Sequence, residues 1–174
     1  MFEYIMPLLV MPTFDNTLLD QTYKAAVERQ IAYGEERGVP WGISESGYNT
    51  VDVHLNYQYR AFGVPGLGLK RGLAEDLVVA PYASALALMV APEAACLNLQ
   101  RLAAGGLAGR LGLFEAIDYT PSRQRRGESS AVVGTFLAHP QGLSLLPLRY
   151  GLRPPPMQKL SQSAPALQRA APPP

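Results

Sequence analysis

The stretch from Trp41 to Asp76 is the part of this chain that limits its possible folds most strongly. It reads WGISESGYNTVDVHLNYQYRAFGVPGLGLKRGLAED and contains the only tryptophan and six of the sixteen glycines. A core helix would show apolar residues at three- and four-residue spacing, and this stretch has no such run. Its aromatic, polar and glycine residues are typical of a surface that binds sugars, because flat rings stack on sugar rings and glycines let the backbone approach a ligand.

Length and composition indicate one globular domain, since 174 residues can bury a sizeable core and 48% of them are hydrophobic. The formal net charge of +1 gives no reason to expect a nucleic-acid partner or an acidic membrane surface. The apolar stretch from Leu77 to Pro92 has sixteen uncharged residues, fewer than the roughly 20 of a membrane-spanning helix. No basic region or cleavage site indicates a signal peptide, so we predict a cytoplasmic chain without a membrane segment.

No metal or cofactor is expected from the sequence. The single cysteine, Cys96, has no second cysteine with which to form a disulfide bond within the chain. The two histidines, His54 and His139, are far apart, and no spacing typical of metal ligands appears.

Local start and stop signals predict several helices. Asn16 or Thr17 can cap a helix that ends at Gly38. If Glu45 is an acid in the first turn of a helix, the segment from Tyr48 to Tyr59 would form that helix. Pro92 suits the first position of a further one.

The C-terminal part of the chain contains one more predicted helix and then a change of composition. Pro140 can occupy the first turn of a helix that runs to about Leu148. From Gly151 onward the chain has seven prolines in twenty-four residues, together with Gln, Ser and Ala. This composition predicts a disordered tail.

Three acidic positions are candidates for chemistry, and each has a structural alternative. Glu45 lies between two serines, where it could equally be an acid in the first turn of a helix. Glu115 lies among aromatic residues in FEAIDYTPSR, where an ion pair with Arg110 or Arg123 is the alternative. Asp76 is as well explained as the N-cap of an apolar helix.

Five segments of the chain resemble the glycoamylase-like domain of cyclic β-1,2-glucan synthases. They are WGISESGYN, YQYRAFGVPGLGLKRGL, EDLVVAPYASALALMV, FEAIDYTPSR and AHPQGLSLL, and the resemblance runs from about Met1 to about Leu148. It implies a carbohydrate-active (α/α)6 barrel that cuts and rejoins β-1,2-glucan chains. The partner that it implies is a β-glucan oligosaccharide or polysaccharide.

The resemblance implies an all-α fold class. An (α/α)6 barrel needs twelve helices, and at about 25 residues for each helix and its loop this chain supplies roughly half of them. We therefore predict a partial toroid with Gly- and aromatic-rich loops over residues 1–150 and a Pro-rich disordered tail at 151–174. The chain would then be a fragment of a larger synthase, in the cytoplasm or at the cytoplasmic face of the inner membrane, with the missing remainder as a second partner.

Cleavage of a glycosidic bond needs one acid that protonates the departing oxygen and a second carboxylate that acts as nucleophile or base. We predict Glu45 and Glu115 as this pair, without assigning the two roles, and Asp76 as a third candidate. The residues predicted to stack on glucose rings or to bind glucose hydroxyls are Trp41, Tyr48, Asn49, Tyr57, Gln58, Tyr59, Lys70, Arg71, Asp118, Tyr119, Arg123, His139 and Gln141.

Three functions remain open at this point. The first is a glucan-active domain. The second is a truncated, catalytically inactive remnant that only binds glucan, which is favoured by His139-Pro140 where the family usually has two adjacent histidines. The third is a helical interaction module whose aromatic residues are all core. An exposed aromatic ring beside Glu45 and Glu115 on one open face would exclude the third.

Overall fold

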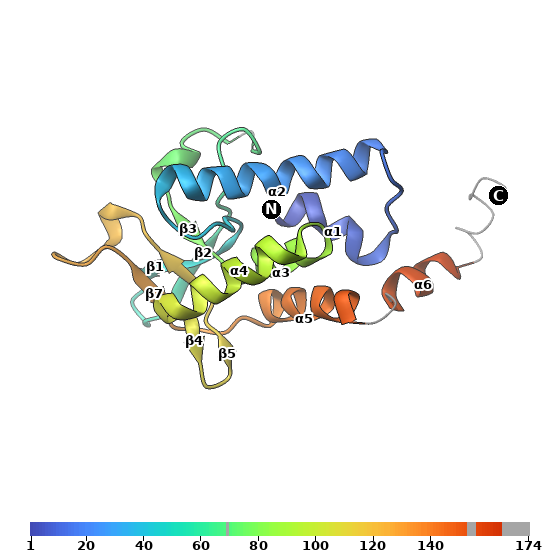
Figure 1. Ribbon diagram of the computed structural model, residues 1–174. Helices are drawn as coiled ribbons and strands as arrows, with labels where there is room; N and C mark the ends of the chain where they lie inside the picture. Colours follow the sequence, from blue (N-terminus) through green and yellow to red (C-terminus); the bar gives the residue numbers. More distant parts are fainter. Residues whose placement is uncertain (69, 153–155, 165–174) are drawn as a thin grey trace.

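The computed structural model of the chain describes residues 1–68, 70–152 and 156–164 (Figure 1). Its helices and helical turns are α1 (Phe2–Val10), α2 (Leu18–Arg37), η1 (Leu73–Glu75), α3 (Pro81–Leu86), η2 (Ala87–Met89), α4 (Pro92–Leu102), η3 (Ala103–Leu107), η4 (Pro121–Arg123), α5 (Ala138–Leu152) and α6 (Pro156–Gln162). Its strands are β1 (Ser46–Val51), β2 (Tyr57–Arg60), β3 (Val78–Val79), β4 (Ala108–Gly109), β5 (Gly112–Leu113), β6 (Ala116–Asp118) and β7 (Ala131–Val133). In Figure 1 the longer helices lie one above another, and the strands gather at one end of the molecule.

The prediction of an all-α fold, and with it the partial (α/α)6 toroid, is wrong. The described residues contain antiparallel sheets formed by β1–β2, by β3–β6–β7 and by β4–β5. The error is clearest between Tyr48 and Tyr59, where one interpretation of Glu45 expects a helix and the chain forms a β-hairpin. Tyrosine, threonine and valine favour strands. The Asp52 carboxylate accepts the N–H groups of His54 and Asn56, and these bonds close the turn of the hairpin.

The three-stranded sheet brings distant parts of the chain to one end of the fold. Strands β3 and β7 both pair antiparallel with β6, and Val79 lies opposite Ile117. Ile43 forms an isolated bridge to Val79, and the Ala80 N–H donates to the Gly42 carbonyl. The exit of β3, the entry of β6, the exit of β7 and the loop 41–45 therefore meet at the same end of this sheet.

Several helix boundaries follow the local signals of the sequence. Thr17 Oγ1 accepts the Asp20 N–H at the start of α2, and Gly38 ends the helix in the left-handed region at φ 67°, as predicted. Pro92 takes the first position of α4, also as predicted. Asp76 is not the N-cap of an apolar helix, because it ends η1 and leads into β3.

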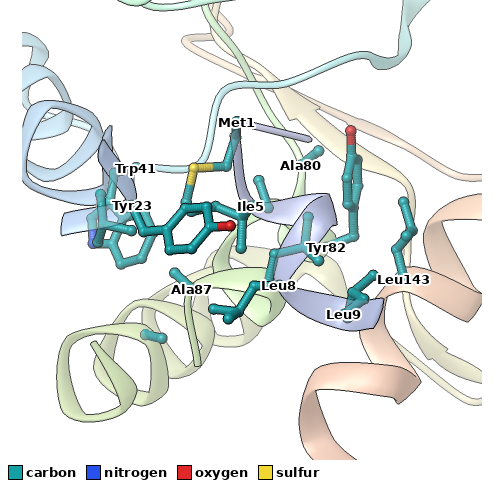
Figure 2. Close-up of a cluster of buried hydrophobic side chains, with 14 residues drawn as sticks. Met1, Ile5, Leu8, Leu9, Tyr23, Trp41, Ala80, Tyr82, Ala87 and Leu143 are labelled. Atoms are coloured by element: carbon teal, nitrogen blue, oxygen red, sulfur yellow. The ribbon is translucent and has the colours of Figure 1, made fainter. Parts of the chain in front are cut away.

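Two apolar cores hold these elements together. The first core joins α1, α2, α3, α4 and α5 (Figure 2), and it includes Ile5, Leu8, Tyr23, Trp41, Tyr82, Leu86 and Leu143. The second core packs around the three-stranded sheet, and it includes Tyr33, Ile43, Phe62, Val79, Leu102, Leu107 and Ile117. Val79 belongs to the second core and Ala80 to the first, so the two cores meet where β3 leads into α3.

Residues 156–162, which we expected to belong to a disordered tail, form the helix α6. The Gln158 side-chain amide donates to the carbonyl oxygens of Leu8 at 2.7 Å and Met11 at 3.1 Å, so α6 rests on the end of α1. Residues 153–155 and 165–174 of the predicted tail lie outside the described residues. In the described part of the chain, no helix has both the length and the apolar character that crossing a membrane requires.

Candidate functional site

The two glutamates predicted as a pair lie at the end of the three-stranded sheet where its strands and the loop 41–45 meet. Glu45 lies two residues after Ile43. The side-chain amide of Gln30 bonds both the main-chain N–H and the main-chain carbonyl of Ile43, each at 2.8 Å. Glu115 directly precedes β6, and its N–H donates to the Thr135 carbonyl. Hydrogen bonds between distant segments therefore place both acids.

Glu45 is half-buried and lies where two surface hollows adjoin. The smaller hollow has a volume of about 190 Å³ and also contains Lys70 in its wall. The larger has a volume of about 640 Å³ and lies between the β1–β2 hairpin and the start of α5. The predicted site residues in the wall of the larger hollow are Glu45, Tyr57, Gln58, Tyr59 and His139.

Glu115 is buried, with 1% of its surface exposed. Its Oε1 accepts the Gly47 N–H at 3.1 Å, and its Oε2 is buried with no hydrogen-bond partner among the described residues. Burial raises the pKa of the Glu115 carboxyl, and the bond from Gly47 opposes this rise only in part. The environment therefore favours the protonated carboxyl, which is the form that can donate a proton.

The hairpin places one phenol close to both acids. Gly47 in β1 lies opposite Tyr59 in β2, and opposite residues of an antiparallel pair project from the same face. A Cβ atom on Gly47 would lie 3.2 Å from Glu115 Cγ, so this face is turned toward Glu115. Burial raises the pKa of the Tyr59 phenol, and the charges of Glu45 and Glu115 act in the same direction. Tyr59 therefore keeps its proton, while 44% of the residue remains exposed.

Glu115 nevertheless lines neither of the hollows that Glu45 borders. Glu115 lines a third hollow of about 250 Å³, together with Tyr82 and Gln141. Pro140 lies in the first turn of α5, as predicted, and it borders both this hollow and the larger one. A half-buried acid and a buried acid thus border different hollows, which have Pro140 in common.

Trp41, which we predicted to stack on a sugar ring, lies in the first core with 5% of its surface exposed (Figure 2). The main-chain N–H of Trp41 donates to Asn98 Oδ1 at 3.2 Å, and the main-chain carbonyl of Trp41 accepts from Asn98 Nδ2 at 2.7 Å. A Cβ atom on Gly34 would lie 2.8 Å from Trp41 Cβ, so α2 packs directly against this residue. This burial favours a structural role for Trp41 over the stacking role that we predicted.

Asp76, Asp118 and Arg123 form an ion-pair network together with Arg60. Arg123 Nε bonds Asp118 Oδ2 and Arg123 Nη1 bonds Asp76 Oδ1, each at 2.6 Å, while Arg60 bonds Asp76 Oδ2. Burial disfavours the charged form of Asp76, but the bonds and charges of Arg123 and Arg60 outweigh it and lower the pKa of this carboxyl. Both oxygens of Asp76 are thus bound to arginine, which favours a structural role over the catalytic one that we predicted.

Three further predicted residues belong to the surroundings of this network. The Asn49 side chain donates to the Arg123 carbonyl at 2.6 Å. The Tyr48 ring meets the Phe62 ring edge-on, and the Arg123 guanidinium lies 5.1 Å from the centre of the Tyr48 ring. Tyr119 is half-buried against the second core. None of these three residues lines the hollows on either side of Glu45.

The other predicted ligands of glucose are spread over the surface of the site. Lys70 borders the smaller hollow, and Arg71 beside it is exposed. The Gln141 side chain donates to the Leu113 carbonyl at 3.1 Å and borders the hollow of Glu115. His139 is exposed, and its ring packs edge-on against Phe2 with the ring centres 5.4 Å apart.

One residue that contacts this site, Tyr82, was not predicted from the sequence. Its hydroxyl is hydrogen-bonded to Ser44 Oγ and to the main-chain carbonyl of Glu45. We interpreted Tyr82 only as part of a buried helix. A tyrosine in the apolar run LVVAPYASALALMV does carry a signal, because a buried phenol needs a hydrogen-bond partner. The sequence does not say where that partner lies.

The family model described as "Putative glucoamylase" matches residues 1–150 of this chain. Among curated proteins, the cyclic beta-(1,2)-glucan synthase NdvB of Rhizobium meliloti (strain 1021) is 49% identical over 145 residues. That match covers 83% of this chain and 5% of the synthase, so the chain spans about one twentieth of this relative.

Solved structures share the fold at low sequence identity. A putative glucoamylase from Bacteroides caccae ATCC 43185 matches with a TM-score of 0.60 and 18% identity, over 96% of this chain and 39% of that one. An endo-beta-1,2-glucanase from Chitinophaga pinensis, solved with sophorotriose and glucose, matches with a TM-score of 0.58 and 18% identity, over 96% of this chain and 38% of that one. At such identities these matches establish the fold alone.

Proposed function

This chain belongs to the family described as "Putative glucoamylase", and on that basis we propose that it is a carbohydrate-active domain that acts on β-1,2-glucan. The substrate class is supported by the synthase relative, which is named for a cyclic β-1,2-glucan. It is supported further by the endo-β-1,2-glucanase that shares the fold.

The reaction that we propose is cleavage of a glycosidic bond followed by transfer of the cut end, as part of a cyclic glucan synthase. Other steps of such a synthase would belong to other parts of it, because this chain matches only 5% of the relative. The domain would comprise residues 1–150 and would work in the cytoplasm or at the cytoplasmic face of the inner membrane.

The observation that carries this proposal is the placement of Glu45 and Glu115 around one phenol beside the larger hollow. The exposed part of Tyr59 and the neighbouring Tyr57 offer rings on which glucose can stack. The hollow of about 640 Å³ falls in the range of pockets that bind small molecules. The exposed ring near both acids also argues against a module whose aromatic residues are all core.

The environments of the two acids suggest their roles. Glu115, whose pKa is raised by burial, would protonate the departing oxygen. Glu45, in the wall of the larger hollow, would act as nucleophile or as base for water. His139 at the rim and Gln58 in the wall would bind hydroxyl groups of the glucan.

A second candidate function is binding of glucan without cleavage. It is favoured by the burial of Glu115, which borders the third hollow and not the larger one. In that case glucan would occupy the larger hollow, and the buried acid would serve only to hold Gly47 and β1 in place.

The test is incubation of the purified chain with linear β-1,2-glucan and analysis of the products by mass spectrometry. Three variants accompany the wild type: Glu45→Gln, Glu115→Gln and, as a matched control, Glu128→Gln at an exposed glutamate. We expect shortened or cyclic products from the wild type and the control, and none from the other two variants.

Binding is measured in parallel by calorimetry on the same four proteins. Binding without products from a folded wild type would support the second candidate. Neither binding nor products would refute both. Equal products from all four proteins would remove Glu45 and Glu115 from the reaction.

A further inference from the structure

Tyr82 lies at the junction of the two cores, in the first turn of α3. The residue is 1% exposed, and its ring belongs to the first core. In Figure 2 the ring stands at the edge of this core, and its hydroxyl points away from Leu8 and Leu143. The polar end of a buried side chain is thus aimed at the loop that carries Glu45.

The hydroxyl of Tyr82 has two partners in that loop. It lies 2.8 Å from Ser44 Oγ and 3.0 Å from the carbonyl oxygen of Glu45. A carbonyl can only accept, so the single proton of Tyr82 serves Glu45, and the Ser44 hydroxyl donates to Tyr82. Ser44 Oγ in turn accepts the N–H of Phe2 at 3.2 Å. A chain of hydrogen bonds therefore runs from α1 to the main chain of Glu45.

The segment around Glu45 is held on both sides of this contact. Gln30 holds both polar groups of the Ile43 main chain, and Glu115 accepts the N–H of Gly47. Between Ile43 and Gly47, the main-chain carbonyl of Glu45 is bonded by a side chain of the described residues, that of Tyr82. Loss of its hydroxyl would free the carbonyl of Glu45 to rotate between two fixed neighbours.

Tyr82 also reaches the other acid of the site. It lines the hollow of about 250 Å³ that Glu115 also borders. Burial raises the pKa of the Tyr82 phenol, and the charges of Glu45 and Glu115 act in the same direction. The phenol therefore stays protonated and continues to donate to Glu45 at every pH at which a glucan reaction is measured.

We propose that Tyr82 is a positioning residue of the site: its hydroxyl fixes the main chain at Glu45 and so sets the direction in which the Glu45 carboxylate meets the glucan. The inference rests on the proposed function for its effect on turnover. Its structural part, the restraint on residues 43–47, stands independently of the substrate.

Tyr82→Phe tests the proposal because it removes the hydroxyl and keeps the ring in the core. The matched control is Tyr23→Phe, since Tyr23 is 3% exposed in the same core and its hydroxyl is not bonded to Ser44 or Glu45. We expect kcat on linear β-1,2-glucan, per folded molecule, to fall about 10- to 100-fold in Tyr82→Phe, because small displacements of a reacting group cost rates of this order. KM should stay within about twofold, since the glucan contacts in the larger hollow remain. The control should keep both values.

The second measurement needs no activity. Hydrogen exchange of a peptide that contains residues 43–47 should be faster in Tyr82→Phe than in the wild type, and unchanged in Tyr23→Phe. Ser44→Ala removes the next bond of the chain and should accelerate the same peptide, which keeps the test open if Tyr82→Phe does not fold.

The outcomes separate the two proposals. Unchanged exchange in both Tyr82→Phe and Ser44→Ala would overturn the positioning role. Faster exchange with an unchanged kcat would likewise overturn it, because the restraint would not matter to the reaction. An inactive wild type with the expected exchange pattern would refute the proposed function and leave the restraint on Glu45 established.

Discussion

The N–H of Gly47 donates to Oε1 of Glu115 at 3.1 Å across sixty-eight positions of the chain. This bond ties the β1–β2 hairpin to the entry of β6, and it is possible because Gly47 has no side chain. A Cβ atom there would lie 3.2 Å from Glu115 Cγ and 3.4 Å from Val133 Cγ1. The absence of a methyl group thus brings the hairpin that carries Tyr59 against the buried acid.

Gly47→Ala should destabilise the fold by about 1–3 kcal/mol, because an added methyl group in a filled space forces its neighbours to shift. Gly142→Ala is the matched control, since no atom lies within 4 Å of the position of its Cβ in α5. Alanine is the better helix former, so the control should gain about 0.5–1 kcal/mol. Urea unfolding measures both changes. Equal effects of the two substitutions would contradict the close packing at Gly47.

Arg123→Met should cost about 3–5 kcal/mol, because it leaves the fully buried carboxylate of Asp118 without its cation. The control is Glu36→Gln, which breaks the exposed pair with Arg29 and should change the stability little. Thermal or urea unfolding compares the two variants. A loss in Arg123→Met no larger than that of the control would show that the network contributes no stability.

Local signals were enough to predict parts of the fold. The start of α2 at Thr17 and its end at Gly38 follow from a side-chain cap and a glycine in the left-handed region, both of which are determined within a few residues. Pro92 at the start of α4 is of the same kind. The sequence predicts such boundaries because no distant partner decides them.

Long-range contacts decided what the sequence could not predict. Trp41 is buried because Asn98 and Gly34 lie against it, and neither is near it in the chain. The sequence does not predict the hairpin at residues 46–60, because its bulged register and its turn at Asp52 break the simple alternation of a strand. We predicted Glu45 and Glu115 as a pair from their settings among aromatic residues, with support from a family resemblance, and sheet pairing is what brings the two acids together.

Trp41 offers a direct optical test of its burial, because it is the only tryptophan of the chain. Its fluorescence should be poorly quenched by iodide in the native state and fully accessible in urea. Addition of β-1,2-glucan should leave the emission unchanged, since the ring lies in the first core. The comparison is Tyr59→Trp, which adds an indole at the exposed wall of the larger hollow and should respond to glucan. A change in the emission of the wild type on addition of glucan would show that Trp41 takes part in glucan binding.

The buried carboxyl of Glu115 should make stability depend on pH. Burial raises its pKa in the folded chain above that of the unfolded chain, which is near the ordinary value of about 4.3. Between these two values the folded chain binds more protons, so the free energy of unfolding falls as the pH rises. Above the pKa of the folded chain, the free energy of unfolding has lost its full share, because the native state must then hold the buried charge of Glu115.

Glu115→Gln removes this titration and keeps the size of the side chain, so it should be more stable than the wild type at neutral pH and similar to it at acidic pH. Asp76, whose pKa is lowered, has the opposite effect and loses its contribution as the pH falls. It is present in both proteins, however, and cancels in the difference between them.

The measurement is the urea midpoint of both proteins from acidic to neutral pH, with Glu128→Gln as a control that should run parallel to the wild type. A constant difference between Glu115→Gln and the wild type at every pH would show that Glu115 titrates alike in the folded and unfolded chain, and its assignment as the proton donor would lose its physical basis.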